Sequence, residues 1–130
     1  MRLDHVTITA GDLVASLEFY DAALGALGLV RVVDLVDEEE EDPEVEAAGW
    51  GPVGGPALLW VVTGPGPTVG AHLRLRADSR SEVEAFYAAA VTAGGRAHDA
   101  PRRWTVYRTG EFNAIVADPD GNLIEVVAPE

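Results

Sequence analysis

Two stretches of the chain alternate strictly between apolar and polar residues, and each predicts a half-buried strand. Over residues 5–10 and again over residues 72–77, every second side chain is apolar. A period of two places the apolar side chains on one strand face, which packs on another element, and the polar side chains on the other. The apolar members are Val6, Ile8 and Ala10 in the first stretch and Leu73, Leu75 and Ala77 in the second.

An amphipathic helix is predicted after each of these strands. Asp12 is a good N-cap for a segment of about Leu13–Ala26, whose apolar residues recur at helical spacing. Ser79, with Glu82 three residues later, forms a capping box for a second helix that runs to Gly94–Gly95. Each helix is therefore expected to cover one face of a small sheet.

Shorter strands complete each half of the chain. The clearest are Leu29–Leu35 and Ala57–Thr63 in the first half, and Ala114–Ala117 and Leu123–Val127 in the second. The last two flank Asp118–Asn122, where proline and glycine specify a tight turn. Both halves then follow the order strand, helix, strand, strand, strand.

The two halves are copies of one unit. An offset of 67 residues carries His5 onto His72 and Phe19–Tyr20 onto Phe86–Tyr87, and an offset of 65 carries Trp60 onto Glu125. Residues 64–70, which are rich in glycine and proline, form a linker. We therefore expect a single domain over residues 1–130, with one module at about 1–63 and a second at about 71–130.

This order of elements predicts an α+β fold made of two βαβββ modules in tandem. Since one helix covers only one face of each sheet, the opposite face, which carries His5 or His72, stays open. A pseudo-twofold relation would set the two open faces around a central cavity, as a cupped mixed sheet with the helices on its outer face. Glu125 shares its strand face with Leu123 and Val127, as an isolated carboxylate whose burial is costly without a cation or a donor.

Composition narrows the classes of function. The formal charge of −13 argues against nucleic-acid binding, which depends on neutralising phosphates. There is no cysteine, no apolar run long enough to span a membrane and no signal peptide, so we expect a cytoplasmic protein that binds no membrane. Nine of the acids lie between Asp34 and Glu46. The run Asp37–Asp42 is interpreted as a solvated loop or, alternatively, as a collar that attracts a cationic ligand.

The chain resembles the vicinal oxygen chelate superfamily, which comprises glyoxalases, bleomycin-resistance proteins and extradiol dioxygenases. The resemblance rests on the repeated βαβββ order, the opening Asp4–His5–Val6 and the stretch Asp118–Glu125. It implies that His5, His72 and Glu125 hold one divalent metal ion (Fe, Mn, Ni, Zn or Co). The fourth ligand position of the family holds Trp60, which cannot bind a metal. Two histidines and one carboxylate leave positions open for a chelating substrate.

The resemblance also implies a homodimer and a small-molecule substrate or drug as ligand. A substrate pocket is expected to include Trp60, Arg74, Trp104 and Tyr107. Trp60 would stack on a planar ligand or simply pack in the core, and Tyr107 would donate a hydrogen bond or cover the core. Arg74 would approach an anionic group or pair with local acids. No catalytic acid or base is assigned.

Three functions stay open on these residues. The first is a lyase, isomerase or dioxygenase in which the metal chelates vicinal oxygens of a small substrate. The second is a metal-free, bleomycin-resistance-like protein that binds a flat or cationic molecule in an acidic cleft. The third is a non-catalytic module with a degenerate cavity.

Overall fold

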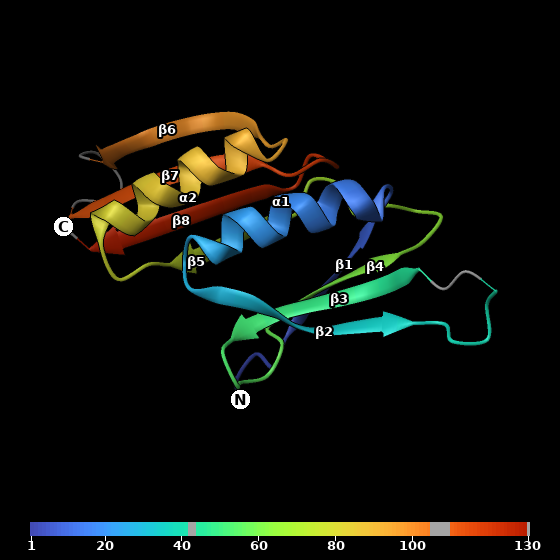
Figure 1. The fold of residues 1–130 in the computed structure, drawn as a ribbon. Helices are drawn as coiled ribbons and strands as arrows, with labels where there is room; N and C mark the ends of the chain where they lie inside the picture. The colour runs from blue at the N-terminus through green and yellow to red at the C-terminus, as the bar shows by residue number, and fades with distance from the viewer. Residues whose placement is uncertain (42–43, 105–109, 130) are drawn as a thin grey trace.

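The computed structural model describes residues 1–41, 44–104 and 110–129 and contains the elements in the predicted order (Figure 1). The first module holds β1 (Val6–Ala10), α1 (Leu13–Gly25), β2 (Leu29–Val36), β3 (Val45–Pro52) and β4 (Leu59–Thr63). The second holds β5 (His72–Arg76), α2 (Arg80–Thr92), β6 (Arg96–Trp104), β7 (Glu111–Ala117) and β8 (Leu123–Pro129). The α+β fold with two βαβββ modules is confirmed.

Each module forms its own four-stranded mixed sheet. The strand orders are β1-β4-β3-β2 and β5-β8-β7-β6, with one parallel pair, β1 with β4 or β5 with β8, in each sheet. In the described part of the chain no ladder joins the two sheets, so the expected cupped sheet consists of two separate halves within one chain. The first strand of each module, β1 or β5, is left as an edge strand.

Local chemistry begins both helices as predicted. The Asp12 carboxylate accepts a hydrogen bond from the Ala15 backbone N–H at 3.2 Å, and the Ser79 hydroxyl accepts one from Glu82 N–H at 3.3 Å. The Glu82 side chain accepts from the backbone N–H of Asp78, one residue before the cap. These contacts satisfy backbone donors that a helix start would otherwise leave unpaired.

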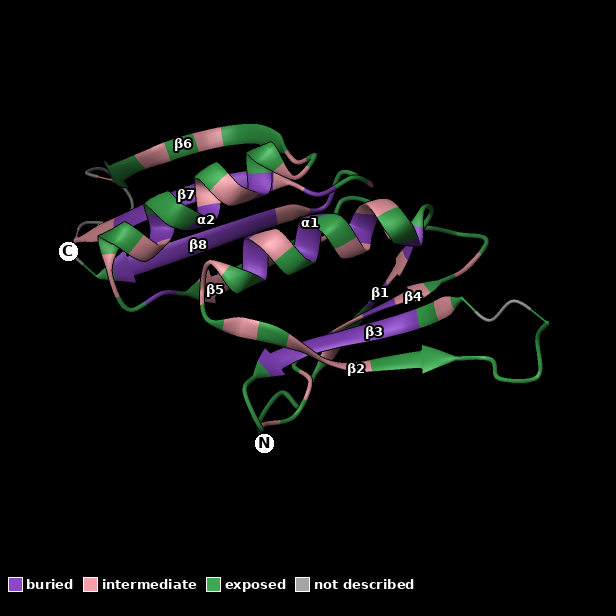
Figure 2. Ribbon diagram, in the orientation of Figure 1, coloured by how far each residue is buried: buried purple, intermediate pink, exposed green. Residues whose placement is uncertain are grey.

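One apolar core joins the modules. It contains aromatic side chains of both helices and both sheets, and the two helices contact each other as well as their own sheets. The central strands β3, β7 and β8 are mostly buried, while β2 and β6 are largely exposed (Figure 2). Gly95 permits the close approach of the modules, because a Cβ there would lie 2.5 Å from Phe19 and 2.6 Å from Val116.

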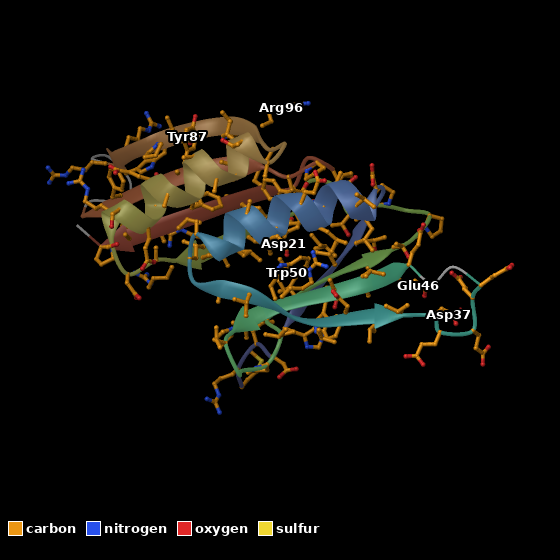
Figure 3. The ribbon with its side chains drawn as sticks, in the orientation of Figure 1. Asp21, Asp37, Glu46, Trp50, Tyr87 and Arg96 are labelled. Atoms are coloured by element: carbon orange, nitrogen blue, oxygen red, sulfur yellow. The ribbon has the colours of Figure 1, made fainter. Side chains whose placement is uncertain are left out.

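The acidic segment extends away from this core. Asp37 and Glu46 lie near the far end of β2 and β3 (Figure 3), and residues 37–41 are all exposed. Exposure in water removes most of the mutual repulsion of these carboxylates. The described part of the segment therefore has the solvation that the loop interpretation requires.

Candidate functional site

The strand β8 separates the core from an open sheet face. Ile124, Val126 and Ala128 belong to the apolar core, so Glu125 and Val127 point to the opposite face. Glu125 is nonetheless only 1% exposed. The face of the second sheet that no helix covers therefore contains a buried carboxylate.

Three side chains surround the Glu125 carboxylate. His72 Nε2 lies 2.8 Å from Oε1, Asn113 Nδ2 donates to Oε2 at 2.7 Å, and Arg74 Nε donates to Oε2 at 3.4 Å. The expectation that this carboxylate is isolated was wrong. Register explains the difference, because β5 places Arg74 opposite Glu125 while β7 brings Asn113 to the same face. Two donors and a neighbouring imidazole compensate for the lost hydration.

A second ring of contacts supports these groups. The Arg74 guanidinium also pairs with Glu111, and the Trp104 indole N–H donates to Asn113 Oδ1. Arg102 lies over the Trp104 ring, 4.1 Å from its centroid. Of the predicted pocket residues, Arg74 thus contacts Glu125 directly, and Trp104 is linked to it through Asn113. Sequence reasoning missed Asn113, although a lone amide in an otherwise apolar strand was an available signal.

His72 and Glu125 are chemically suited to one divalent ion. Two ligands at about 2.1 Å from an ion and about 90° apart are separated by about 3 Å. The 2.8 Å between Nε2 and Oε1 is close to that value. An imidazole nitrogen and a carboxylate oxygen are also a common donor combination for Fe, Mn, Ni, Zn and Co.

His5 lies on the other module, just before β1. Its Nδ1 is 2.9 Å from the Asp4 carboxylate, and both side chains are substantially exposed. Over residues 1–41, 44–104 and 110–129, the only three acidic or histidine side chains with ligand atoms within 4.8 Å of one another are Asp37, Glu40 and Glu46. One chain therefore does not gather His5 with His72 and Glu125, and the three-ligand set stays a prediction.

Trp60 occupies the place in the first sheet that Glu125 occupies in the second. It pairs with Thr7 as Glu125 pairs with Arg74. Its ring lies against β3 at Gly49, where an added Cβ would come within 3.2 Å of ring atom Cδ2 and 2.7 Å of Ala57. The glycine makes room for the indole on the open face, where it remains partly exposed.

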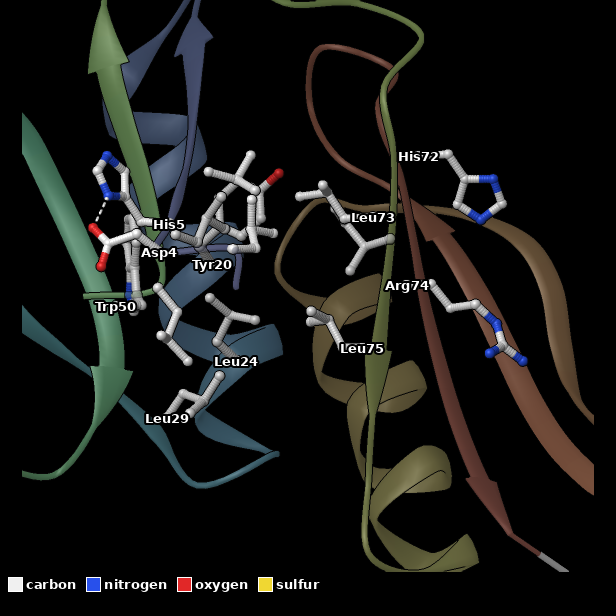
Figure 4. Close-up of a pocket in the computed structure, with 15 residues that line it drawn as sticks. Asp4, His5, Tyr20, Leu24, Leu29, Trp50, His72, Leu73, Arg74 and Leu75 are labelled. Atoms are coloured by element: carbon white, nitrogen blue, oxygen red, sulfur yellow. Dashed lines mark hydrogen bonds and ion pairs between the residues drawn. The ribbon is translucent and has the colours of Figure 1, made fainter. Parts of the chain in front are cut away.

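A cavity of about 400 Å³ lies between the modules (Figure 4). Its lining includes both predicted histidines, but Leu73 and Leu75 of β5 point toward the cavity while His72 and Arg74 point away from it. The cavity and the Glu125 cluster thus lie on opposite sides of β5. Its apolar lining consists mainly of Leu24, Leu29, Leu58, Leu59, Leu73 and Leu75, with Tyr20 and Trp50.

One predicted pocket residue, Tyr107, and the third histidine of the chain, His98, remain to be placed. Tyr107 falls in segment 105–109, outside the described residues. His98 lies on β6, with Nδ1 3.4 Å from the Asp99 carboxylate. Among the helices of the described residues, none is long and apolar enough to cross a membrane.

Comparisons with known proteins agree with this architecture. The family model of the Glyoxalase/Bleomycin resistance protein/Dioxygenase superfamily matches residues 2–126. The crystal structure of a glyoxalase/bleomycin resistance protein from Albidiferax ferrireducens T118 is similar at a TM-score of 0.76 and 26% identity, over 98% of each chain. No curated protein sequence matches the chain.

Two further structures share the fold at lower identity. A glyoxalase-related enzyme from Fulvimarina pelagi has a TM-score of 0.70 at 21% identity, over 98% of this chain and 88% of that one. Glyoxalase I from Zea mays has a TM-score of 0.66 at 18% identity, over 98% of this chain and 47% of that one. The chain thus corresponds to about half of the maize enzyme.

Proposed function

The chain belongs to the glyoxalase/bleomycin resistance protein/dioxygenase superfamily, and from this premise we propose that it binds a small molecule through one divalent metal ion held by His72 and Glu125. The observation that carries the proposal is the 2.8 Å approach of His72 Nε2 to a fully buried carboxylate on an open sheet face. Asn113 donates a hydrogen bond to the other oxygen of that carboxylate, Oε2, and so fixes its orientation.

The third ligand in this proposal is His5 of a second copy of the chain. Within one chain His5 lies just before β1 of the other module and is paired with Asp4. The edge strands β1 and β5 border an apolar cavity, and both are free to approach the matching edges of another copy. A twofold arrangement that sets β1 of one copy beside β5 of the other forms the site twice, with the same residues each time.

The remaining residues of the site bind and orient the ligand. A divalent ion here would act as a Lewis acid on two neighbouring oxygens of the bound molecule. Arg74 lies beside Glu125 and places positive charge near those oxygens. Trp60 and Trp104 present indoles from the two modules, which favours a ligand with a flat, apolar part. Lyase, isomerase and dioxygenase chemistry are all compatible with this arrangement.

Complementation between two inactive variants tests the shared site. His5→Ala and His72→Ala chains should each bind almost no Mn²⁺ in isothermal titration calorimetry. When the two are unfolded together and refolded, a mixed dimer has one site with both substitutions and one site with neither. We expect about half of a site per dimer to be recovered in a statistical mixture, because about half of the dimers are then mixed. Recovery of no binding, while wild-type chains bind fully, contradicts a site shared between copies.

A second function is favoured by one specific contact. Arg74 and Asn113 already compensate the Glu125 carboxylate with a cation and an amide donor. The cluster therefore does not require an ion for burial, as expected of a metal-free, bleomycin-resistance-like protein. Titration with bleomycin in the presence of EDTA distinguishes the two functions, since chelation abolishes binding only where the metal holds the ligand.

A further inference from the structure

The turn Asp118–Asn122 does more than connect β7 to β8. The Asp118 side chain, 4% exposed, accepts hydrogen bonds at Oδ1 from the backbone N–H groups of Asp120 and Asn122, both at 2.9 Å. Its Oδ2 accepts from Asn122 Nδ2 at 3.0 Å and from the Tyr20 hydroxyl at 2.5 Å. Three of these contacts are local, while the fourth comes from α1 of the other module.

Further contacts from the same turn hold the linker and the end of β1. The Asn122 side chain donates to the Thr68 carbonyl at 2.8 Å and accepts from Ala71 N–H at 3.0 Å. The Asp120 carboxylate accepts from Gly11 N–H at 3.2 Å. Hydrogen bonds thus connect the turn to α1, to the segment after β1 and to the linker.

The first module shows that this polar turn is not a requirement of the βαβββ unit. At the offset of 65 residues, the stretch Val53–Ala57 stands where Asp118–Asn122 stands in the second module. That stretch contains no carboxylate or amide side chain and still connects β3 to β4. The added polar groups therefore serve contacts outside their own sheet.

The tyrosines of the repeat differ in the same way. Tyr20 is fully buried, and its ring contacts Trp50 at a centroid distance of 5.6 Å. Tyr87, at the matching position of α2, is only partly buried, and no hydrogen bond of its hydroxyl is found among the described residues. Burial and the neighbouring Asp118 hold the pKa of Tyr20 well above its ordinary value, so this hydroxyl remains a donor.

We infer that Tyr20 is a positioning residue, whose bond to Asp118 sets the orientation of the sheet that carries His5 relative to the sheet that carries His72 and Glu125. The inference rests on the proposed function in so far as it predicts an effect on metal binding. Because β1 and β5 must both meet a second copy, a change in the angle between the sheets displaces His5 from the other two ligands. The hydroxyl thus acts on the site from a distance.

Tyr20→Phe, with Tyr87→Phe as the matched control, tests the inference. Both variants lose one phenolic oxygen from the same position of the repeat. Since the chain has no cysteine, spin labels can be attached at Val53→Cys and Ala88→Cys, one exposed site in each module. Dilution with unlabelled chains restricts pulsed dipolar spectroscopy to distances within one chain. We expect a single narrow distance in the wild-type background and in Tyr87→Phe, and a broadened or shifted one in Tyr20→Phe.

Mn²⁺ affinity, measured by calorimetry on the unlabelled variants, gives the second readout. Tyr20→Phe should weaken binding about tenfold, the usual scale of coupling between distant groups, while Tyr87→Phe should leave it unchanged. Asp120→Ala serves as a second variant should Tyr20→Phe fail to fold. It removes the exposed contact to Gly11 and should change the distance and the Mn²⁺ affinity in the same direction, but less.

The two readouts separate this inference from the proposed function. A wild-type chain that binds no Mn²⁺ refutes the metal proposal, and a broadened distance in Tyr20→Phe then still supports the role in orientation. Distances and affinities that are the same in Tyr20→Phe and Tyr87→Phe overturn the inference. An altered distance with unaltered affinity limits Tyr20 to the architecture and refutes its effect on the site.

Discussion

Glu125→Gln keeps the shape of the side chain and removes its charge. The glutamine oxygen can still accept from Asn113, and its amide can donate to an unprotonated His72 Nε2, so the fold should survive. Hydrogen bonds to a charged acceptor are stronger than neutral ones by about 1 kcal/mol each. Arg74 is partly exposed, which reduces its share, and the variant no longer pays to desolvate a carboxylate.

These terms give a loss of about 2 kcal/mol for the metal-free protein. For a chain of this size, that loss lowers the melting temperature by about 6–8 °C. Under the proposed function, Mn²⁺ binds only the native state, so at a hundred times its dissociation constant it should stabilise the wild-type protein by about 2.7 kcal/mol. The wild-type melting temperature should therefore rise by about 8–10 °C with the ion. That of Glu125→Gln should stay almost the same.

Differential scanning calorimetry in EDTA and in Mn²⁺ measures both quantities. The matched control is Glu111→Gln, which removes the other carboxylate paired with Arg74 but does not touch His72. It should keep the full metal-induced shift. Equal shifts in the wild type and in Glu125→Gln would refute the ligand role of this carboxylate. An unchanged melting temperature in EDTA would refute the strength assigned to its three contacts.

Three further outcomes are expected. Gly49→Ala should destabilise the protein by about 2 kcal/mol in urea unfolding, because the new Cβ would lie within 2.7 Å of Ala57 and 2.9 Å of Val33. Trp60→Glu should tighten Mn²⁺ binding in calorimetry, since it supplies a carboxylate at the fourth ligand position. Tyr20 ionises in the unfolded chain near pH 10 but resists ionisation when folded, so stability should fall by about 1.4 kcal/mol per pH unit above pH 10. Tyr20→Phe should lack that part of the slope in alkaline urea titrations.

Local signals predicted much of the fold. Asp12 and Ser79 begin their helices at the expected residues, because a cap depends on only a few neighbouring groups. The strands β3 and β6 were not located from sequence. β3 contains Ala47, Ala48 and Gly49, and β6 is mostly polar with two register shifts, so tertiary pairing rather than intrinsic preference makes them strands.

Sequence reasoning indicated His72, Arg74 and Glu125 of this cluster, but neither Asn113 nor the contacts among these side chains. The repeat picked out His72 and Glu125, which lie in contact, and the alternation on β5 placed Arg74 on the same face. The face on which the Asn113 side chain lies depends on the register of β7 with β8. A shift of one residue would have placed this side chain in the core. The separation of His5 depends on how the modules pack, which the repeat itself does not encode.

The position of β8 in its sheet has a consequence for synthesis on the ribosome. In spatial order it lies between β5 and β7, although it is the last strand in sequence. A growing chain that has reached β7 therefore has a gap in the middle of its second sheet, with unpaired edges on both sides. The same strand brings Glu125, so the proposed ligand site and the closed sheet are completed together. A translation product that stops before residue 123 would expose apolar strand edges to chaperones and proteases instead of entering the functional pool.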